Sequence, residues 1–378
     1  MVWFIVIICN NINFIYNQWK LIIRSIHHNI IKNVKGIGGI IIIVLESQTK
    51  DKDVNKLLEI LDHKNVQAHE VNGLDSKVLI LSGDTHKIDP YSIESIDIVK
   101  KYIEIKDPYK KANRLFHSED SVYDIKGKTI GGKNIALIAG PCSVESQQQI
   151  EDIAKKVKRD GASFLRGGAF KPRTSPYTFQ GLGTAGLEYL KEAGKKTGLP
   201  IVTEIMSADY MDQFVEYADI IQVGARNMQN YALLKELGKI NKPILLKRGL
   251  SATIEEFLLS AEYIMANGND KVILCERGIR TFETYTRNTL DLSAVVAIKR
   301  LSHLPIIVDP SHACGRDWMV SSLSKAAIAV GADGLIIEVC EDPENAVSDG
   351  QQTLTPFCYK KLVKELRVLA KAVGRDIA

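Results

Sequence analysis

Eight short apolar segments recur between residue 135 and residue 339 of this 378-residue chain. They are IALIAG (135–140), SFLRG (163–167), PIVTEI (200–205), DIIQVG (219–224), PILLKRG (243–249), VILCERG (272–278), PIIVDPSH (305–312) and GLIIEV (334–339). Stretches with apolar residues at helical spacing lie between them, and several of these stretches end in glycine. Eight parallel strands that alternate with helices over about 245 residues predict a TIM barrel, the (β/α)8 fold of the α/β class.

The residues at the ends of these segments are mostly ionisable. They are Cys142, Arg166, Lys171, Glu204, Arg226, Lys247, Glu276, Arg277, Asp309, His312 and Glu338. A single residue of this kind is usually a solvated loop residue, but the strand ends of a barrel meet at one mouth. Five cations at one mouth repel one another unless anions are present. The sequence therefore predicts a substrate with several negative charges, most simply phosphate and carboxylate groups held by Arg and Lys.

Four residues of the same rim form a candidate metal site. Cys142, His312, Glu338 and Asp349, the last in the loop SDGQQ, offer a thiolate, an imidazole and two carboxylates. Such a mixed set suits Mn, Fe, Co or Zn better than Mg or Ca. Taken singly, Cys142 could be a small buried apolar residue and Asp349 a turn residue, so only the shared rim favours a metal.

Residues 39–106 show a second regular pattern. Strands are predicted at 40–45, 67–71, 77–83 and 102–105, and helices at 52–64 and 92–101. The order βαββαβ indicates a ferredoxin-like fold, which is common in small regulatory domains. Polar residues 107–134 are expected to form a linker with a hairpin, followed by the barrel at 135–378.

Residues 1–38 are rich in Ile and Asn and poor in acidic residues. The apolar run at the start is too short to span a bilayer, and no positively charged segment precedes it. Apolar residues from Trp19 to Val34 recur at helical spacing with Lys and Arg between them, so a helix on a membrane surface is the alternative. We expect an extension outside the fold and no membrane span.

Charge and cysteine usage narrow the function classes. The formal net charge is only +4, and no basic tract or stripe suggests binding to nucleic acid. The six cysteines include no CxxC pair, so neither a disulfide framework nor a zinc ribbon is indicated, and a cytoplasmic location is expected. GLGTAG (181–186) matches the dinucleotide-binding pattern, but a long loop separates it from the preceding strand, which argues against that function.

Several longer motifs resemble those of 3-deoxy-7-phosphoheptulonate (DAHP) synthases of the type I beta class. They are AGPCSVES, LRGGAFKPRTSPYTFQGLG, VGARNMQNYALLKELG, ILLKRG, CERGIRTFETYTRNTLDL, VDPSHACGR and IIEVCEDPENAVSDGQQTL. The resemblance runs through the whole barrel, and residues 39–106 also resemble the regulatory domain of that class. It implies condensation of phosphoenolpyruvate with erythrose 4-phosphate and release of phosphate, at the entry to the shikimate pathway of aromatic amino acid biosynthesis.

The resemblance also implies roles for single residues. Arg166 and Lys171 would hold the carboxylate side of phosphoenolpyruvate, and Arg226, Lys247 and Arg277 its phosphate. Arg173 and Thr174 would bind the phosphate of the sugar. Cys142, His312, Glu338 and Asp349 would hold the metal, which polarises the sugar aldehyde as a Lewis acid. Lys171 would also donate or accept a proton.

The family further implies a tyrosine or phenylalanine effector and a homotetramer. One departure concerns Cys340, which stands in the segment EVC where the family usually has histidine, near the expected metal. Two alternatives stay open. A 3-deoxy-octulosonate 8-phosphate synthase uses arabinose 5-phosphate on a related barrel, although the loop KPRT argues against it. A catalytically inactive sensor of aromatic amino acids is the other.

Overall fold

The computed structural model describes residues 40–377, except 73–75, 106–107, 172–174 and 176. The expected extension at residues 1–38 therefore lies outside the described residues. The described chain divides into two compact units between Ser118 and Glu119, and each is considered by itself. No helix of the described part is long and apolar enough to cross a membrane.

The first unit confirms the predicted ferredoxin-like fold. Its four strands form one antiparallel sheet in the order β2-β3-β1-β4. Alternate side chains of β1 and β3, such as Ile43 and Leu79, pack with Leu57 and Leu61 in one apolar core. The elements are β1 (Ile40–Leu45), α2 (Asp51–Asp62), β2 (Val66–Asn72), β3 (Lys77–Gly83), η1 (Thr85–Lys87), α3 (Pro90–Glu94) and β4 (Val99–Ile105).

The helix predicted at 92–101 is wrong beyond Glu94. Helix α3 ends at Glu94, and residues from Val99 onward belong to β4. Asp89 starts the helix, because its side chain accepts hydrogen bonds from the backbone N–H groups of Tyr91 and Ser92. Val99 then pairs with Leu45 of β1. Pairing in the sheet therefore decides the conformation of a segment whose local pattern also fits a helix.

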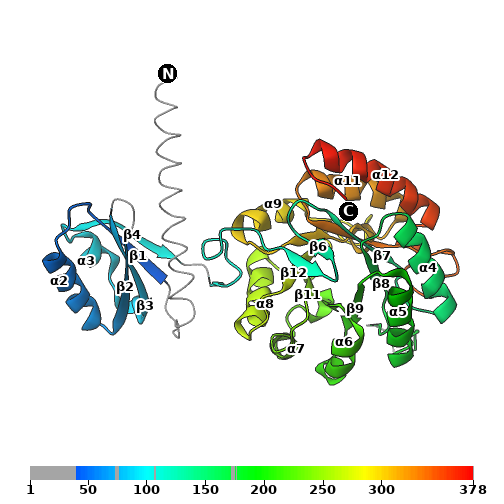
Figure 1. The fold of residues 1–378 in the computed structure, drawn as a ribbon, viewed down its shortest axis with the longest axis horizontal. Coiled ribbons are helices and arrows are strands. Elements are labelled where there is room, and N and C mark those ends of the chain that lie inside the picture. The colour runs from blue at the N-terminus through cyan, green and yellow to red at the C-terminus, as the bar shows by residue number, and fades with distance from the viewer. Residues whose placement is uncertain (1–39, 73–75, 106–107, 172–174, 176, 378) are drawn as a thin grey trace, which may run out of the picture. The chain divides into compact units, whose positions relative to one another are not determined.

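The second unit is a closed barrel of eight parallel strands in the order β10-β11-β12-β13-β14-β7-β8-β9, which confirms the predicted TIM barrel. Figure 1 shows the strands inside a ring of helices. The strands are β7 (Ala136–Gly140), β8 (Phe164–Arg166), β9 (Ile201–Ile205), β10 (Ile220–Val223), β11 (Ile244–Lys247), β12 (Val272–Glu276), β13 (Ile306–Val308) and β14 (Gly334–Glu338). The helices are α4 (Gln147–Arg159), α5 (Thr184–Thr197), α6 (Met211–Tyr217), α7 (Tyr231–Leu237), α8 (Ile254–Ala266), α9 (Leu292–Leu301), α10 (Pro310–Cys314), α11 (Asp317–Ala329) and α12 (Pro356–Ala372). Short 3-10 turns are η2 (Ala208–Tyr210), η3 (Ala225–Asn227) and η4 (Gly350–Gln352).

The glycine-rich segment 181–186 leads into helix α5 and does not follow a strand directly. Strand β8 ends at Arg166, and Gly181 crosses the chain at Ala169, where a Cβ atom would lie 2.1 Å from the Ala169 carbonyl oxygen. Gly181 also has a φ of +98°. The glycine serves a tight chain crossing, so the segment lacks the strand-to-helix context of a dinucleotide site.

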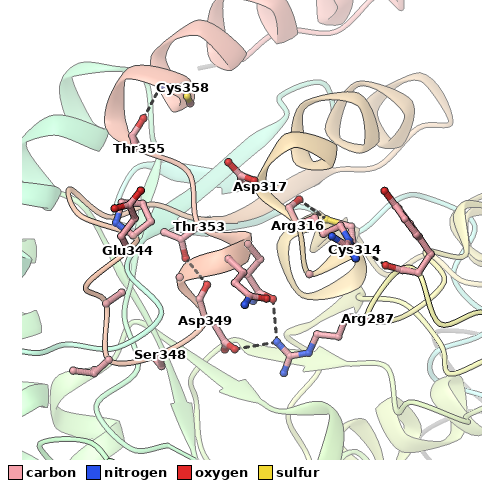
Figure 2. Close-up of a pocket in the computed structure, with 18 of the residues that line it drawn as sticks. Arg287, Cys314, Arg316, Asp317, Glu344, Ser348, Asp349, Thr353, Thr355 and Cys358 are labelled. Carbon is pink, nitrogen blue, oxygen red and sulfur yellow. Dashed lines mark hydrogen bonds and ion pairs between the residues drawn. The ribbon is translucent and has the colours of Figure 1, made fainter.

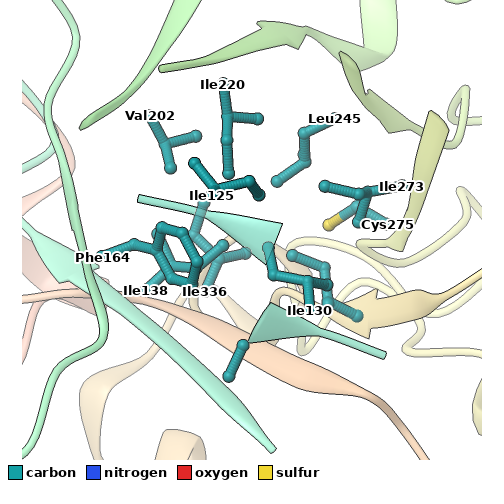
Figure 3. Close-up of a cluster of buried hydrophobic side chains, with 12 residues drawn as sticks. Ile125, Ile130, Ile138, Phe164, Val202, Ile220, Leu245, Ile273, Cys275 and Ile336 are labelled. Carbon is teal, nitrogen blue, oxygen red and sulfur yellow. The ribbon is translucent and has the colours of Figure 1, made fainter. Parts of the chain in front are cut away.

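A β-hairpin closes the amino-terminal end of the barrel. Strands β5 (Tyr123–Ile125) and β6 (Lys128–Ile130) form the hairpin predicted within 107–134. Ile125 and Ile130 pack against a cluster of barrel residues, as Figure 3 shows; these include Phe164, Val202, Ile220, Leu245 and Ile273. Tyr123 donates a hydrogen bond to the carbonyl oxygen of Asp270 at 2.8 Å. Apolar side chains thus cover the amino-terminal end of the barrel, opposite the carboxyl ends of the strands.

This seal contributes to stability. Ile130 is fully buried, so we expect Ile130→Ala to lower the free energy of unfolding by about 2–5 kcal/mol, because it leaves a cavity in the barrel floor. Urea denaturation followed by circular dichroism measures the change. Val122→Ala in the same segment is the control, since Val122 is 51% exposed and should change stability by less than about 0.5 kcal/mol. Equal effects of the two substitutions would contradict the prediction.

Candidate active site at the mouth of the barrel

Most of the predicted site residues gather at the carboxyl ends of the strands. Arg166, Lys247 and Glu338 are the last residues of β8, β11 and β14. Glu204 lies near the end of β9, His312 lies in the short helix α10, and Cys142, Lys171, Arg226, Arg277 and Asp349 follow their strands. A cavity of about 540 Å³ opens there. Its lining includes Lys171, Glu204, Arg226, Lys247, Arg277 and His312. The rim that the sequence predicts is therefore one continuous site.

The four predicted metal ligands lie together. One ligand atom from each of Cys142, His312, Glu338 and Asp349 can be chosen so that all four lie within 4.8 Å of one another. Cys142 Sγ is 3.3 Å from Asp349 Oδ2, and His312 Nε2 is 3.3 Å from Glu338 Oε1. One sulfur, one nitrogen and two oxygens fit a divalent transition metal. We call these four residues the ligand group.

Glu338 is the most enclosed member of the ligand group. Its side chain is fully buried, and Arg166 Nη1 lies 2.6 Å from Oε1. Gln352 donates a hydrogen bond to Oε2 at 2.7 Å. Burial alone would raise the pKa of Glu338, but His312 and Arg166 outweigh it and hold the pKa below its usual value. Glu338 is therefore an ionised carboxylate that can serve as a ligand.

His312 is oriented by the buried residue Asp309. Nδ1 of His312 lies 2.7 Å from Asp309 Oδ2, and the His312 backbone N–H donates to Asp309 Oδ1 at 2.9 Å. Lys247 Nζ lies 2.5 Å from the same Oδ2 atom. Burial lowers the pKa of His312 despite the two nearby carboxylates, so the ring is neutral near pH 7. A proton on Nδ1, next to the Asp309 carboxylate, would leave the Nε2 lone pair for a metal.

Cys142 is held by two cations. Lys171 Nζ donates to the Cys142 carbonyl oxygen at 2.8 Å and lies 3.0 Å from Sγ. Arg166 donates to the same carbonyl oxygen at 3.3 Å. Burial raises the pKa of the Cys142 thiol to about 12; Glu338 adds to this shift, while Lys171 and Arg166 oppose it. Without a metal, Cys142 is a protonated thiol at neutral pH.

Metal binding should therefore release one proton. A metal takes the thiolate, and His312 is already neutral above about pH 7, so only the Cys142 proton has to leave. We expect the metal association constant to rise about tenfold per pH unit between about pH 7 and 9. Calorimetric titration with Mn²⁺ in buffers of different ionisation enthalpy counts the protons released. Cys358→Ser, an exposed cysteine outside the ligand group, should release the same number as the wild type, and release of no proton would contradict the raised pKa.

Arg277 presents an unsatisfied donor at the mouth. Its Nη2 donates to the His312 carbonyl oxygen at 3.2 Å, but Nη1 is buried and has no hydrogen-bond partner among the described residues. Burial lowers the pKa of Arg277. A buried guanidinium N–H without a partner costs free energy, so this atom indicates the place of an anion. Lys171, Arg226 and Lys247 line the same cavity.

Glu204 also faces this cavity, from strand β9. Gln222 of the neighbouring strand donates to Glu204 Oε2 at 2.8 Å. Gly224 makes room for the carboxylate, because a Cβ atom there would lie 2.0 Å from Glu204 Oε1. Glu204 is thus a fixed carboxylate among the cations of this cavity.

The remaining predicted residues are Arg173, Thr174 and Cys340. Arg173 and Thr174 lie outside the described residues, although Ser175 and Thr178 of the same loop line the cavity. Cys340 is buried, and burial raises the pKa of its thiol. The other groups that most affect this thiol are the backbone of Asp342 and the carboxylates of Glu145, Asp342 and Glu341, none of which belongs to the ligand group.

Sequence reasoning missed two residues that contact the ligand group. Gln352 contacts Glu338 as described above, and Arg287 Nη1 lies 3.0 Å from both Asp349 Oδ1 and Gln352 Oε1. Burial would raise the pKa of Asp349, but Arg287 and His312 lower it to about 2. Gln352 could have been suspected because it stands three residues after Asp349. Arg287 lies well inside the long loop between β12 and α9 and not directly after a strand, so its position relative to a strand end does not mark it.

A second cavity, of about 980 Å³, lies beside the ligand group. Figure 2 shows its lining, which includes Arg287, Cys314, Arg316, Asp349, Thr353 and Cys358. Arg287 and Asp349 line both cavities. These two residues therefore form part of the wall between the mouth of the barrel and the second cavity.

Comparison with known proteins gives matches over both units of the chain. Residues 115–373 match the model of the DAHP synthetase I family, and residues 41–107 match the model of the DAHP synthase ferredoxin-like domain. The phospho-2-dehydro-3-deoxyheptonate aldolase of Thermotoga maritima is 51% identical over 333 residues, which cover 88% of this chain and 98% of that protein.

A crystal structure of the Thermotoga maritima phospho-2-dehydro-3-deoxyheptonate aldolase (DAHP synthase) aligns with a TM-score of 0.73 at 49% sequence identity. The alignment covers 90% of this chain and 100% of that chain. The 2-dehydro-3-deoxyphosphooctonate aldolase of Syntrophotalea carbinolica is 31% identical over 260 residues, or 64% of this chain and 93% of that protein.

Proposed function

Because this chain belongs to the DAHP synthetase I family, we propose that the mouth of its barrel is where it joins phosphoenolpyruvate to erythrose 4-phosphate. The chain is a DAHP synthase, which serves aromatic amino acid biosynthesis. The octulosonate 8-phosphate alternative has only distant relatives in its support. What remains to be proposed is how the residues of this site divide the work.

The observation that carries the proposed site is the unpaired Nη1 of Arg277. Arg277, Arg226 and Lys247 together offer three cations to one anion. We therefore propose that these residues bind the phosphate of phosphoenolpyruvate. Lys171 would bind the carboxylate side. Arg166 is paired with Glu338 and is not among the residues that line the cavity, so its proposed contribution is to hold Glu338 and to add positive charge on the carboxylate side.

The ligand group is proposed to hold Mn, Fe, Co or Zn, and a bound ion would polarise the aldehyde oxygen of the sugar as a Lewis acid. Arg173 and Thr174 are proposed to bind the sugar phosphate. The cations serve to offset the repulsion between two polyanionic reactants and to hold them face to face. They thereby lower the entropic cost of bringing the reactants together.

The bonds change as follows in this proposal. C3 of phosphoenolpyruvate attacks the aldehyde carbon, and the positive charge that develops at C2 is quenched by water. The hemiketal phosphate then loses inorganic phosphate, whose charge Arg226, Lys247 and Arg277 stabilise as it departs. Lys171 Nζ faces both the cavity and Cys142, so it is the proposed group that moves a proton to or from the reacting atoms.

The other parts of the chain complete the proposal. Residues 39–106 are proposed as a regulatory domain for tyrosine or phenylalanine, residues 107–134 as the connection to the barrel domain at 135–378, and residues 1–38 as an extension outside the fold. A homotetramer is proposed from the resemblance to the family, and a cytoplasmic location is proposed because the cysteines of the described residues are free.

The deciding experiment measures phosphate release from phosphoenolpyruvate with erythrose 4-phosphate or arabinose 5-phosphate as acceptor. Each reaction is run with chelator and with added Mn²⁺, and each with and without tyrosine or phenylalanine. Metal-dependent turnover restricted to erythrose 4-phosphate supports the proposed site. Turnover that chelator leaves unchanged would overturn the role of the ligand group, and the absence of turnover with every metal would favour an inactive sensor.

A further inference from the structure

We propose that Arg287 is a positioning residue for the ligand group, which it acts on through Asp349 and Gln352. It would hold one oxygen of Asp349 directly and one oxygen of Glu338 through the Gln352 amide, so that each carboxylate keeps its other oxygen for the metal. The inference rests on the metal site proposed above. It assigns a function to a side chain that neither the sequence pattern nor the proposed reaction uses.

The contact geometry of Arg287 supports this positioning role. Figure 2 shows its guanidinium directed at Asp349. Nη1 lies 3.0 Å from Asp349 Oδ1 and 3.0 Å from Gln352 Oε1. The other carboxylate oxygen, Asp349 Oδ2, lies 3.3 Å from Cys142 Sγ. Arg287 thus occupies the oxygen that points away from the sulfur ligand and leaves the oxygen that points toward it.

Gln352 connects Arg287 to Glu338 through its side-chain amide. Its amide oxygen accepts from Arg287, and its amide nitrogen donates to Glu338 Oε2 at 2.7 Å. The other oxygen, Glu338 Oε1, lies 3.3 Å from His312 Nε2 and also accepts from Arg166 Nη1 at 2.6 Å, so it keeps one lone pair for a metal. An amide can serve both partners only in this orientation, since Arg287 can only donate and an ionised Glu338 can only accept. Two carboxylates of the ligand group are therefore held from one guanidinium.

The backbone of Asp349 adopts an uncommon conformation that its surroundings must support. Its φ is +55°, a left-handed conformation that is uncommon for residues other than glycine, although asparagine and aspartate adopt it more often than most. Thr353 Oγ1 donates to the Asp349 carbonyl oxygen at 2.9 Å. Gly350 is packed so closely that a Cβ atom would lie 1.9 Å from the Pro343 carbonyl oxygen. Such a conformation persists only where the surroundings determine it, and Arg287 supplies the side-chain part of that support.

Arg287 itself is held in place by its neighbours. Its backbone N–H donates to the Cys314 carbonyl oxygen at 3.1 Å. Gly315 leaves room for the side chain, because a Cβ atom there would lie 2.7 Å from Arg287 Cβ. The loop that carries Arg287, the end of α10 and the segment 349–353 therefore meet at this one side chain. An incidental surface ion pair would lack such a fixed base.

The test is metal affinity measured without substrates. Co²⁺ is titrated into the full-length protein in competition with a chromophoric chelator, for the wild type and for Arg287→Met. Partners that orient metal ligands typically contribute 10–100-fold to affinity, so we expect Arg287→Met to bind Co²⁺ about 10–100-fold more weakly. Because the Arg287 side chain is 40% exposed, the variant should fold, and its thermal unfolding is checked against the wild type.

Three further variants sharpen the result. Arg316→Met is the matched control, since Arg316 lines the same cavity but stacks on Tyr285; it should bind Co²⁺ like the wild type. Arg287→Lys, which keeps the charge, should restore part of the affinity. Gln352→Leu should weaken binding in the same range as Arg287→Met. The absorption bands of bound Co²⁺, including the thiolate charge-transfer band, should shift in Arg287→Met and stay unchanged in Arg316→Met.

The outcomes separate the inference from the metal site. If the wild type binds no Co²⁺ at the ligand group, the proposed metal site itself is wrong. If the wild type binds and Arg287→Met binds equally well with the same spectrum, only the positioning role of Arg287 is wrong. If Arg287→Met keeps its Co²⁺ affinity but raises the KM for the sugar phosphate, Arg287 is a substrate-binding residue, which also overturns the inference.

Discussion

Replacement of Cys142 by alanine is expected to lower kcat roughly 1,000-fold or more. Cys142 supplies the sulfur of the ligand group and lies within hydrogen-bonding distance of Lys171. Its loss would remove a metal ligand, and Lewis-acid activation of a carbonyl contributes several kcal/mol to transition-state stabilisation, at about 1.4 kcal/mol per factor of ten. Steady-state assays of phosphate release with saturating Mn²⁺ measure the change, together with the metal content of the purified variant.

The control for this prediction is Cys358→Ala. Cys358 is exposed and lies outside the ligand group, so its loss should leave kcat within about twofold of the wild type, in line with surface substitutions away from a site. Should the Cys142 variant retain both its metal and its turnover, the sulfur would not be a ligand, and the cysteine would be a small buried residue after all.

Asp309→Ala is expected to have the largest effect on stability. Asp309 is fully buried between Lys247 and His312, and it also caps helix α10 through the His312 backbone N–H. Its removal would leave the buried ammonium of Lys247 without its carboxylate, and breaking a buried pair in this way costs about 3–5 kcal/mol. Urea denaturation should show a loss of this size, and kcat should fall as well because His312 is no longer oriented.

The matched control is Asp317→Ala. Asp317 is an exposed carboxylate in the first turn of α11, where a favourable interaction with the helix dipole contributes about 0.3–1 kcal/mol. A loss of stability in Asp309→Ala no larger than in Asp317→Ala would mean that the Lys247 ammonium finds another partner or leaves the interior.

The pH dependence of the Asp309 effect has a definite sign. The pKa of Asp309 lies well below its usual value, because His312 and Lys247 outweigh the effect of burial. A carboxylate with a lowered pKa stabilises the folded protein above the pKa of the unfolded state, about 3.9 for Asp. This stabilisation is lost only as the pH falls below that value. The difference between wild type and Asp309→Ala should therefore be constant from about pH 5 to 6 and shrink in more acidic solution.

The barrel and its ligand group could be predicted because both depend on short-range pattern and topology. Each strand is an apolar run bounded by polar or glycine residues, and parallel strands in a barrel carry their carboxyl ends to one mouth. Cys142, His312, Glu338 and Asp349 are far apart in sequence, yet the position of each relative to a strand end was sufficient to bring them together.

The remaining features depend on contacts that no local pattern encodes. Segment 92–101 has helical spacing, but it is helical only as far as Glu94, and its residues from Val99 onward belong to β4, which pairs with β1. Asp309 could be placed on the rim, while its role in orienting His312 became visible only from the distance between the two side chains. Arg287 lies in a loop without strand or helix signal, and its contact with Asp349 spans 62 positions in the sequence. Loops that fold against one another set these contacts, which a periodicity cannot reveal.

The hairpin formed by β5 and β6 has a consequence for where reactants can enter and products can leave the enzyme. Ile125 and Ile130 cover one end of the barrel, whose interior is filled with packed side chains. In the proposed reaction, both reactants and the attacking water therefore enter at the mouth, and the departing phosphate leaves on the same side. A ligand or loop that covered the mouth would then stop turnover without any change at the opposite end of the barrel.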